Sequence, residues 1–264
     1  MQKHLEAIIK QAAQIMINKA PKGVSSKEGH ANFVTEADKE TQDFLEEKLL
    51  ALLPGSVLFG EEKVNEPLTD EPTWVVDPID GTLNYIHGLN HSAVSVALVK
   101  DKQVELGFIY NPFQDELFSA QLGKGAYLNG QPISCSSTPF ERAVVFYGTS
   151  PYDARLVDAT FGAVSSLMRK TADIRRFGSA ALDLAYIACG RGDLYFEYAL
   201  SPWDYAAGML IVTEAGGVFK ALNRRDDALD FSAPAAVFVS NPLCEAEGLQ
   251  IVQKEYSNWQ AQRR

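Results

Sequence analysis

The sequence has few cysteines and lacks long apolar runs. Its three cysteines, Cys135, Cys189 and Cys244, are an odd number without CxxC spacing, which excludes a disulfide framework and a thiolate metal site. No uncharged apolar stretch approaches the roughly 18 residues that a membrane span requires. We also find no internal repeat and no linker of flexible composition, so the chain is expected to pack as one unit.

Positive charge is scarce as well. The sequence has 24 lysines and arginines against 34 aspartates and glutamates, a formal net charge of −10. A field of this sign repels polyanions, so we expect no nucleic-acid partner. The N-terminal stretch carries Lys3, Glu6 and Lys10 and lacks a small-residue cleavage site, unlike a secretory signal. We therefore expect a cytoplasmic protein without membrane association.

Length and apolar content are those of an ordinary globular protein. The chain has 264 residues, of which 46% are hydrophobic, and this suits one large domain or two packed halves. We place the division between an N-terminal half of residues 1–138 and a C-terminal half of residues 139–264.

The N-terminal half begins with two helical patterns and continues with strands. Apolar side chains at three- and four-residue steps predict one helix before Pro21 and a second between Thr35 and Pro54, joined by a polar loop over residues 24–32. Asn129-Gly130 predicts a type I′ hairpin turn, because both residues tolerate positive φ. Short period-two runs predict an antiparallel meander, over residues 57–59, 74–76, 93–99, 104–110 and 116–120.

Strands and helices alternate in the C-terminal half. We predict strands over residues 143–147, 174–177, 194–196, 218–219 and 235–239. We predict helices over residues 153–170, 179–189 and 203–215, and a last helix begun by Pro242 and capped by Asn241. This alternation predicts an α/β layer sandwich with a mixed sheet.

The most informative segment is residues 74–82 (WVVDPIDGT), where an apolar strand ends in two carboxylates. Pro78 fixes φ and Gly81 permits a sharp turn, so Asp77 and Asp80 can point at one place. Two converging carboxylates beside free N–H groups suit a hard cation and a phosphate. The alternative is a capped turn in which both side chains only accept local hydrogen bonds.

Two further segments end in acids. Glu61 and Glu62 follow the apolar run 57–59, and Asp204 opens the helix predicted over residues 203–215. The alternatives are a solvated acidic loop, which we favour for Glu62, and an ordinary helix N-cap for Asp204. Four acids at three strand or helix ends could hold two or three Mg²⁺ ions, which take few protein carboxylates each and accept phosphate oxygens.

These segments resemble a known family. Gly60-Glu61-Glu62, residues 77–82 (DPIDGT) and residues 203–208 (WDYAAG) resemble, in order and spacing, the signature segments of the inositol monophosphatase family, and residues 174–185 (IRRFGSAALDLA) are similar to its intervening segment. The resemblance implies an α+β fold, the layered α-β-α-β-α sandwich shared with fructose-1,6-bisphosphatases. It further implies a homodimer that hydrolyses a small-molecule phosphate monoester with Mg²⁺ and is inhibited by lithium.

The resemblance also implies roles for particular residues. The first Mg²⁺ site falls on Glu61, Asp77 and the backbone carbonyl of Ile79, the second on Asp77, Asp80 and Asp204, and a third, weaker ion near Glu61. Thr82 and Glu61 would orient a metal-activated water for in-line attack on phosphorus, with Asp38 hydrogen-bonded to the threonine. The remaining alternative for Asp38 is an exposed acid on the second helix.

Substrate binding is implied by a second group of residues. The family binds phosphate at the positions of Gly81 and Thr82, and substrate hydroxyls at those of Gly178, Ser179, Ala180, Glu197 and Asp204. Lys27 matches a basic residue on a mobile loop, whereas Asp183 is interpreted as a structural residue that caps or pairs within the core. His87 and His91 are interpreted as structural rather than as general acids.

Two departures from the family pattern leave the substrate open. They are Leu83, after the DPIDGT segment, and residues 148–152, and both are expected near the alcohol part of the substrate. Residues 84–88 (NYIHG) favour an inositol-1-monophosphatase. The alternatives are a fructose-1,6-bisphosphatase, a histidinol-phosphatase, a 3′-phosphoadenosine 5′-phosphate phosphatase, or a catalytically silent Mg²⁺-binding interaction protein. Some bacterial relatives have a second role with RNA polymerase, which the acidic composition does not support.

Overall fold

The structure is a computed structural model that describes residues 1–19, 24–26, 33–65, 71–151, 153–224 and 234–261. Its α-helices are α1 (Gln2–Asn18), α2 (Glu36–Leu52), α3 (Thr82–Ile86), α4 (Val157–Met168), α5 (Ala180–Ala188), α6 (Pro202–Glu214) and α7 (Glu245–Ala261). Its strands are β1 (Ser25–Ser26), β2 (Phe33–Val34), β3 (Val57–Gly60), β4 (Thr73–Asp80), β5 (Ala93–Lys100), β6 (Gln103–Asn111), β7 (Glu116–Gln121), β8 (Ala126–Leu128), β9 (Gln131–Ile133), β10 (Val144–Tyr147), β11 (Asp173–Arg175), β12 (Leu194–Leu200), β13 (Val218–Ala221) and β14 (Ala235–Ser240).

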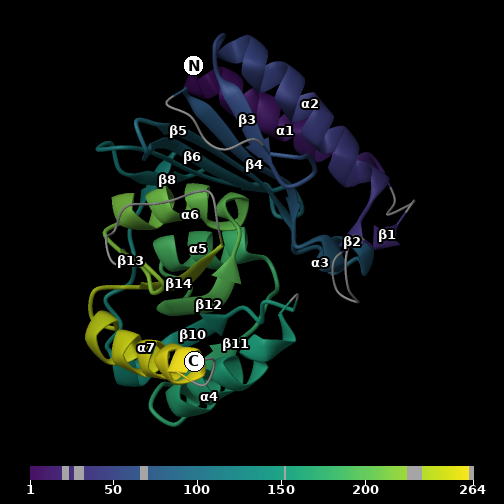
Figure 1. Ribbon diagram of the computed structural model, residues 1–264. Coiled ribbons are helices and arrows are strands. Elements are labelled where there is room, and N and C mark those ends of the chain that lie inside the picture. The colour runs from purple at the N-terminus through teal and green to yellow at the C-terminus, as the bar shows by residue number, and fades with distance from the viewer. Residues whose placement is uncertain (20–23, 27–32, 66–70, 152, 225–233, 262–264) are drawn as a thin grey trace.

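The elements stack in five layers, as predicted (Figure 1). Helices α1 and α2 cover the outer face of a seven-stranded sheet with the order β3-β4-β5-β6-β7-β8-β9. Helices α5 and α6 lie between that sheet and a five-stranded sheet with the order β11-β10-β12-β14-β13, whose outer face is covered by α4 and α7. The first sheet is antiparallel from β4 to β9, and the second is mixed.

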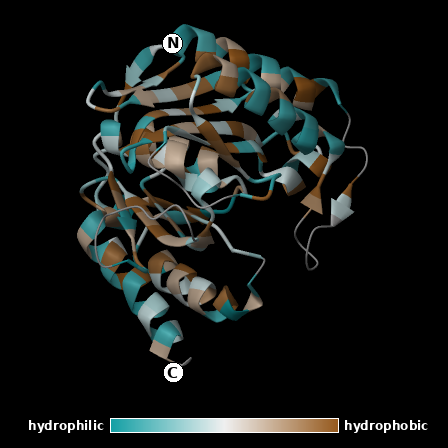
Figure 2. Ribbon diagram, turned by 45° about the horizontal axis from the view of Figure 1, so that its top comes forward, coloured by the Kyte–Doolittle hydropathy of each residue, from teal (hydrophilic) through white to brown (hydrophobic). Residues whose placement is uncertain are grey.

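Alternation along the strands explains the layers. In β4, Trp74 and Val76 pack with α1 and α2, whereas Val75 packs with the central helices. The same alternation separates Val96 from Ala97 in β5, because successive side chains of a strand point to opposite faces. Figure 2 shows apolar strands beneath outer helices with hydrophilic surfaces. Every residue of α5 is buried, as expected for a helix that lies between two sheets.

Helix α6 lies directly against the seven-stranded sheet. A Cβ at Gly107 of β6 would lie 2.7 Å from the carbonyl oxygen of Ala207, so only glycine permits this approach. The Ser95 hydroxyl of β5 also donates to the carbonyl oxygen of Trp203 at 3.3 Å. These contacts place the beginning of α6 near the end of β4, where the acidic segment lies.

Several local predictions can be compared with the structure. Asn129 and Gly130 connect β8 and β9 with φ values of 48° and 76°, so the predicted hairpin turn is confirmed. The predicted start of the last helix at Pro242 is wrong. Helix α7 begins at Glu245, and the Asn241 side chain accepts from the Cys244 N–H at 2.9 Å in the turn before it. The division at residue 138 stays a prediction.

Other differences concern element ends. Part of the expected loop 24–32 forms the short strand β1, and the strand expected over residues 174–177 is β11, which ends at Arg175. The expected helix 153–170 begins with a 3₁₀ turn, so α4 itself starts at Val157. The three cysteines are free. No helix in the described part of the chain has the length and apolar character needed to cross a membrane.

Candidate active site

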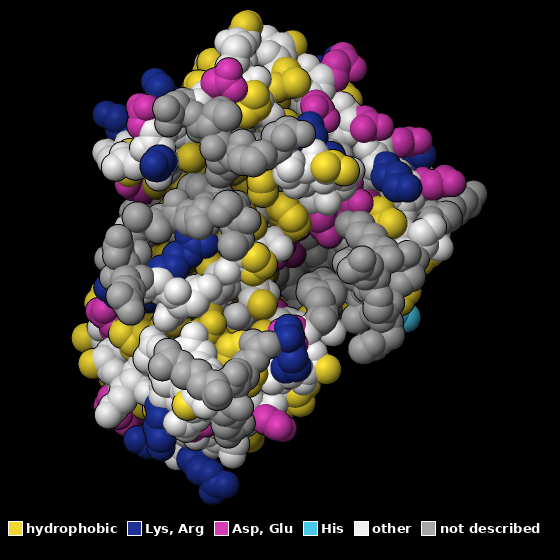
Figure 3. Space-filling view, viewed as in Figure 1, with side chains coloured by type: hydrophobic (Ala, Val, Ile, Leu, Met, Phe, Trp, Pro, Cys, Tyr) yellow, Lys and Arg dark blue, Asp and Glu magenta, His cyan; other side chains and the backbone are white. Residues whose placement is uncertain are grey.

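A pocket of about 130 Å³ opens where β3, β4, α5, β12 and α6 meet. Figure 3 shows acidic side chains inside a hollow on this face of the molecule. Among the described residues, all those predicted for catalysis, metal binding or substrate binding line this pocket except Asp38, whose carboxylate lies 3.4 Å from the Thr82 hydroxyl. The lining residues from that set are Glu61, Asp77, Ile79, Asp80, Gly81, Thr82, Gly178, Ser179, Ala180, Glu197 and Asp204.

Sheet topology brings Glu61 to Asp77. Strands β3 and β4 are parallel, so their carboxyl ends lie at the same edge of the sheet. The Glu61 N–H donates to the Val76 carbonyl at 3.2 Å, directly before Asp77. The next N–H, that of Glu62, donates to the Gln42 side chain at 2.9 Å, which holds the segment after β3 against α2.

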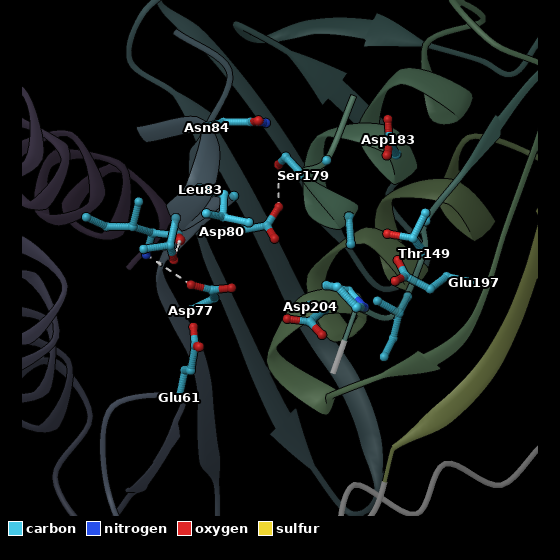
Figure 4. A pocket seen from close by; sticks show the side chains of 18 of the residues that line it. Glu61, Asp77, Asp80, Leu83, Asn84, Thr149, Ser179, Asp183, Glu197 and Asp204 are labelled. Carbon is cyan, nitrogen blue, oxygen red and sulfur yellow. Dashed lines mark hydrogen bonds between the residues drawn. The ribbon is translucent and has the colours of Figure 1, made fainter. Parts of the chain in front are cut away.

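Asp80 is held by the beginning of α5. The pairing of β4 with β5 is irregular between Asp77 and Asp80, which lets both carboxylates face the pocket. One Asp80 oxygen accepts from the Ser179 hydroxyl and from the Ala181 N–H, the latter at 2.9 Å. Figure 4 shows its other oxygen directed toward the space between Asp77 and Asp204.

Gly81 must be glycine for two reasons. Its φ is +84°, and a Cβ there would lie 3.1 Å from the His91 carbonyl oxygen and 3.2 Å from that of Gly178. A side chain would therefore be strained in the backbone and tight against two carbonyls. The turn after Asp80 accordingly depends on this residue.

Asp204 is the third residue of α6 rather than its N-cap. Ser201 is the N-cap, and an Asp204 oxygen accepts from the Ser201 N–H at 2.7 Å. One carboxylate oxygen from each of Asp77, Asp80 and Asp204 lies within 4.8 Å of the others. Figure 4 shows Glu61 pointing at the same space from the side of β3.

Without a cation, the burial of Asp77, Asp80 and Asp204 makes ionisation of their carboxyl groups energetically costly. Burial raises the pKa of Asp77 well above its usual range, and the charges of Glu61, Asp80 and Asp204 add to the effect. Burial likewise raises the pKa of Asp204, with further contributions from Asp80 and Glu61. The pKa of Asp80 rises to about 6, although its bonds from Ser179 and Ala181 oppose the change. Buried oxygen ligands that repel one another fit a hard divalent cation.

A divalent cation is therefore expected to stabilise the protein in a pH-dependent way. Because the folded protein holds protons on these carboxyls more tightly than the unfolded chain does, their contribution to the free energy of unfolding of the metal-free protein is fully present below about pH 4. This contribution is lost as pH rises through about 6 and above. Cations bind the ionised carboxylates, so Mg²⁺ should raise Tm more at pH 8 than at pH 5. Thermal unfolding with Mg²⁺ or with a chelator measures this, and equal Tm values in both at pH 8 would contradict it.

Thr82 and Asp38 form the inner side of the site. The Thr82 hydroxyl lies 3.1 Å from the Ile79 carbonyl oxygen and 3.4 Å from an Asp38 carboxylate oxygen. It has one hydrogen and can donate it in a hydrogen bond to either acceptor. Asp38 is fully buried and also accepts from the Thr35 N–H at 2.8 Å in the capping box of α2. The alternative of an exposed acid at Asp38 is therefore wrong.

Glu197 lies on the opposite side of the pocket and is held by protein donors. Its carboxylate accepts from the Tyr195 hydroxyl at 2.7 Å and from the Ser150 N–H and hydroxyl at 2.7 and 3.1 Å. Burial raises the pKa of Glu197, whereas these bonds and the charge of Arg176 oppose the rise. Sequence reasoning did not find Ser150 or Tyr195; only the departure at residues 148–152 marked this region.

Arg176 lines the pocket itself, and sequence reasoning did not assign it to the site. Its guanidinium donates to the Thr149 hydroxyl at 3.2 Å. Arg176 lies within the segment 174–185, two positions before Gly178. An arginine at such a position does not by itself indicate a binding site. Leu83 and residues 148, 149 and 151 also line the pocket, as expected from their departure from the family pattern.

Asp183, the fourth residue of α5, lies at the pocket. It is buried, lines the pocket, and one of its carboxyl oxygens has no hydrogen-bond partner among the described residues. Burial raises its pKa well above the usual range, with contributions from Asp80 and Glu197. Ser179 rather than Asp183 is the N-cap of α5, so the expected capping role is wrong, and the structural interpretation of Asp183 otherwise stays a prediction.

The remaining predicted residues lie elsewhere. His91 packs against the rings of Phe177 and Tyr186, and burial lowers its pKa. His87 ends α3, and neither histidine is among the described residues that line the pocket. Lys27 lies outside the described residues.

Comparison with known proteins adds to this geometry. A model of the inositol monophosphatase family matches residues 1–258. Inositol monophosphatase 3 of Solanum lycopersicum is 45% identical over 197 residues, 72% of this chain and 73% of that protein. The Nus factor SuhB of Escherichia coli K12 is 40% identical over 196 residues, 74% of this chain and 73% of that protein. The solved IMPase of Thermotoga maritima has a TM-score of 0.87 and 30% identity, and the match covers 98% of this chain and 100% of that one.

Proposed function

The chain belongs to the inositol monophosphatase family, and on that basis we propose that it is a Mg²⁺-dependent phosphatase that hydrolyses inositol monophosphate. One observation carries the proposal: Asp77, Asp80 and Asp204 offer carboxylate oxygens within 4.8 Å of one another in the pocket that Glu61 also lines. Every acid of the family's ligand set is thus present and faces one space. The homodimer implied by the family is part of this proposal.

We assign the cation ligands as the resemblance implies. Glu61, Asp77 and the Ile79 carbonyl would hold one Mg²⁺, and Asp77, Asp80 and Asp204 a second, with a third near Glu61. When bound, the ions supply Lewis-acid activation of water and neutralise the charge that develops on the leaving oxygen. The carboxylate set suits Mg²⁺, which prefers oxygen ligands and keeps positions open for water and phosphate.

The protein's own groups orient the reactants. The Thr82 hydroxyl can donate a hydrogen bond to the Asp38 carboxylate or to the Ile79 carbonyl, so its oxygen would be free to accept a hydrogen bond from the attacking water, and Glu61 would accept a second one from the same water. The N–H groups of Gly81 and Thr82 would bind the phosphate oxygens after the positive-φ turn. Ser179, Ala180, Glu197 and Asp204 would contact the substrate hydroxyls, with Gly178 leaving room for them.

Phosphate release from candidate esters tests this function. We expect Mg²⁺-dependent hydrolysis of myo-inositol 1-phosphate in preference to fructose 1,6-bisphosphate, histidinol phosphate and 3′-phosphoadenosine 5′-phosphate, and inhibition by lithium in the same assay. A preference for one of the other esters would keep the phosphatase and replace its substrate. Hydrolysis that a chelator does not abolish would exclude the cation assignment.

A non-catalytic interaction role is the second candidate. The 40% identical relative carries the name of a Nus factor, which supports a protein-interaction role in this family. The two candidates differ in one measurement, because an interaction protein would be folded and bind Mg²⁺ but release no phosphate from the four esters. That result would favour the second candidate.

A further inference from the structure

Helix α2 presents two buried polar side chains to the candidate active site. Asp38 and Gln42 are four residues apart, so they lie on the same face of the helix, and both are almost completely buried. Helix α2 packs against β3 and β4; Glu61 directly follows β3, and Asp77 lies in β4. Buried polar side chains in folded proteins are hydrogen-bonded, so their partners show what they hold in place. Asp38 and Gln42 hold different parts of the site.

Gln42 contacts the chain on both sides of Glu61. Its Oε1 accepts a hydrogen bond from the Glu62 N–H at 2.9 Å. A Cβ at Gly60 would lie 2.5 Å from the same oxygen, so the absence of a side chain lets the amide lie this close to the backbone before Glu61. The Glu61 N–H itself donates to the Val76 carbonyl of β4 at 3.2 Å. Glu61 thus lies between two residues whose backbone is placed against the Gln42 amide.

Two other contacts of this turn are weaker restraints on Glu61. Asn65 shapes the turn but does not tie it to another element: its Oδ1 accepts from the Gly60 N–H at 2.9 Å, and its Nδ2 donates to the Gly60 carbonyl at 2.8 Å. Lys63 pairs with Glu46 of α2, but these side chains are 30% and 34% exposed. Exposed ion pairs contribute little, whereas the buried Gln42 side chain ties the turn directly to α2.

We propose that Gln42 is a positioning residue that fixes Glu61 toward the cation, acting through the Glu62 N–H. Asp38 lies 3.4 Å from the Thr82 hydroxyl, so one face of α2 sets the relative placement of the two groups that would orient the attacking water. The inference rests on the proposed Mg²⁺-dependent phosphatase function and deepens it at the cation end of the pocket. Misplacement of a catalytic group by about 1 Å can cost on the order of a hundredfold in rate, so one hydrogen bond at this place has a large effect.

Two variants of Gln42 with opposite chemistry test the proposal. Gln42→Leu keeps a side chain of similar size and removes the acceptor, whereas Gln42→Glu keeps an acceptor oxygen at the same position. Gln42→Leu should raise the Mg²⁺ Kd measured by titration calorimetry about tenfold and lower kcat for myo-inositol 1-phosphate about tenfold or more. Its KM at saturating Mg²⁺ should change by less than about twofold, because the alcohol end of the pocket, at Glu197, lies opposite Glu61 (Figure 4). Gln42→Glu should stay within about threefold of the unaltered protein in Kd, kcat and KM.

A role of Gln42 in packing alone predicts the reverse order of the two variants. Leucine would then be tolerated at this buried position, and glutamate would be the harmful replacement because it buries a charge near Asp38 and Glu46. Lys63→Met is the control, since it removes the surface contact of the same turn with α2 and should change the Mg²⁺ Kd by less than about twofold. Thermal unfolding in chelator shows for each variant whether the fold itself is altered.

Three results would overturn the proposal: an unchanged Mg²⁺ Kd in Gln42→Leu, a larger loss in Gln42→Glu than in Gln42→Leu, or an equal loss in Lys63→Met. If Gln42→Leu does not fold, Gly60→Ala displaces the same amide from the other side and should raise the Mg²⁺ Kd by a similar factor, with an unchanged Kd again overturning the proposal. Failure of the phosphatase function is distinguishable, because the unaltered protein would then bind Mg²⁺ but release no phosphate. The dependence of Mg²⁺ binding on Gln42 is still measured in that case.

Discussion

Asp80→Asn should lower Mg²⁺-dependent turnover by about a thousandfold or more, because a cation contributes several kcal/mol of charge stabilisation in the transition state. One Asp80 oxygen accepts from Ser179 and Ala181. The carbonyl oxygen of asparagine can keep both bonds, which turns its NH₂ group toward the cation. An amide N–H is a donor and cannot be a metal ligand.

The fold should survive this change. In metal-free protein Asp80→Asn removes one charge from a buried group of like charges, so Tm in chelator should be equal to or above that of the unaltered protein. Phosphate release and thermal unfolding on the same preparation separate the two effects. Asp115→Asn is the control, since Asp115 pairs with Lys10 at the surface. Retention of more than about a tenth of the activity would remove Asp80 from the metal ligands.

Gly148→Ala should destabilise the protein and weaken substrate binding together. The new Cβ would lie 1.7 Å from one Glu197 oxygen and 2.7 Å from the other, so Glu197 must move away from Tyr195 and Ser150. A buried carboxylate that loses these donors costs about 2–3 kcal/mol of unfolding free energy. Urea unfolding measures that loss, and we expect a rise in KM larger than the fall in kcat because the change lies at the alcohol end.

A glycine of α4 provides the matched control. Gly162→Ala also places a methyl group near a glutamate oxygen, that of Glu255 at 3.1 Å, but Glu255 is only partly buried and can move. A neutral or slightly positive effect on stability is expected there, because alanine favours the helix. If the contact with Glu197 is the cause, Gly148→Ala should cost little in a Glu197→Ala background. An equal cost in both backgrounds would refute this explanation.

Much of the fold could be predicted because its periodicities are strong. Trp74, Val75 and Val76 are all apolar and end in Asp77, and this pattern identified a buried strand with an acidic end. Asn129-Gly130 identified its turn, because few other residue pairs adopt two successive positive φ values cheaply. The start of α7 was predicted wrongly because the Asn241 side chain accepts a hydrogen bond within a turn before the helix rather than at the helix N-terminus. Asparagine is favoured at both kinds of position.

The sequence by itself determined the layered fold through its strand and helix patterns, and the family through the resemblance of its motifs. Local spacing also placed Glu61, Asp77, Asp80 and Asp204 at strand or helix ends, so these acids could be expected at one place. Tertiary structure alone decided the other end of the pocket. No local pattern marks Ser150, and Glu197 meets it only where the loop after β10 lies beside β12, whereas Tyr195 lies two residues before Glu197 on the same strand. Hydrogen bonds and burial between segments far apart in the chain depend on packing, which residue spacing does not encode.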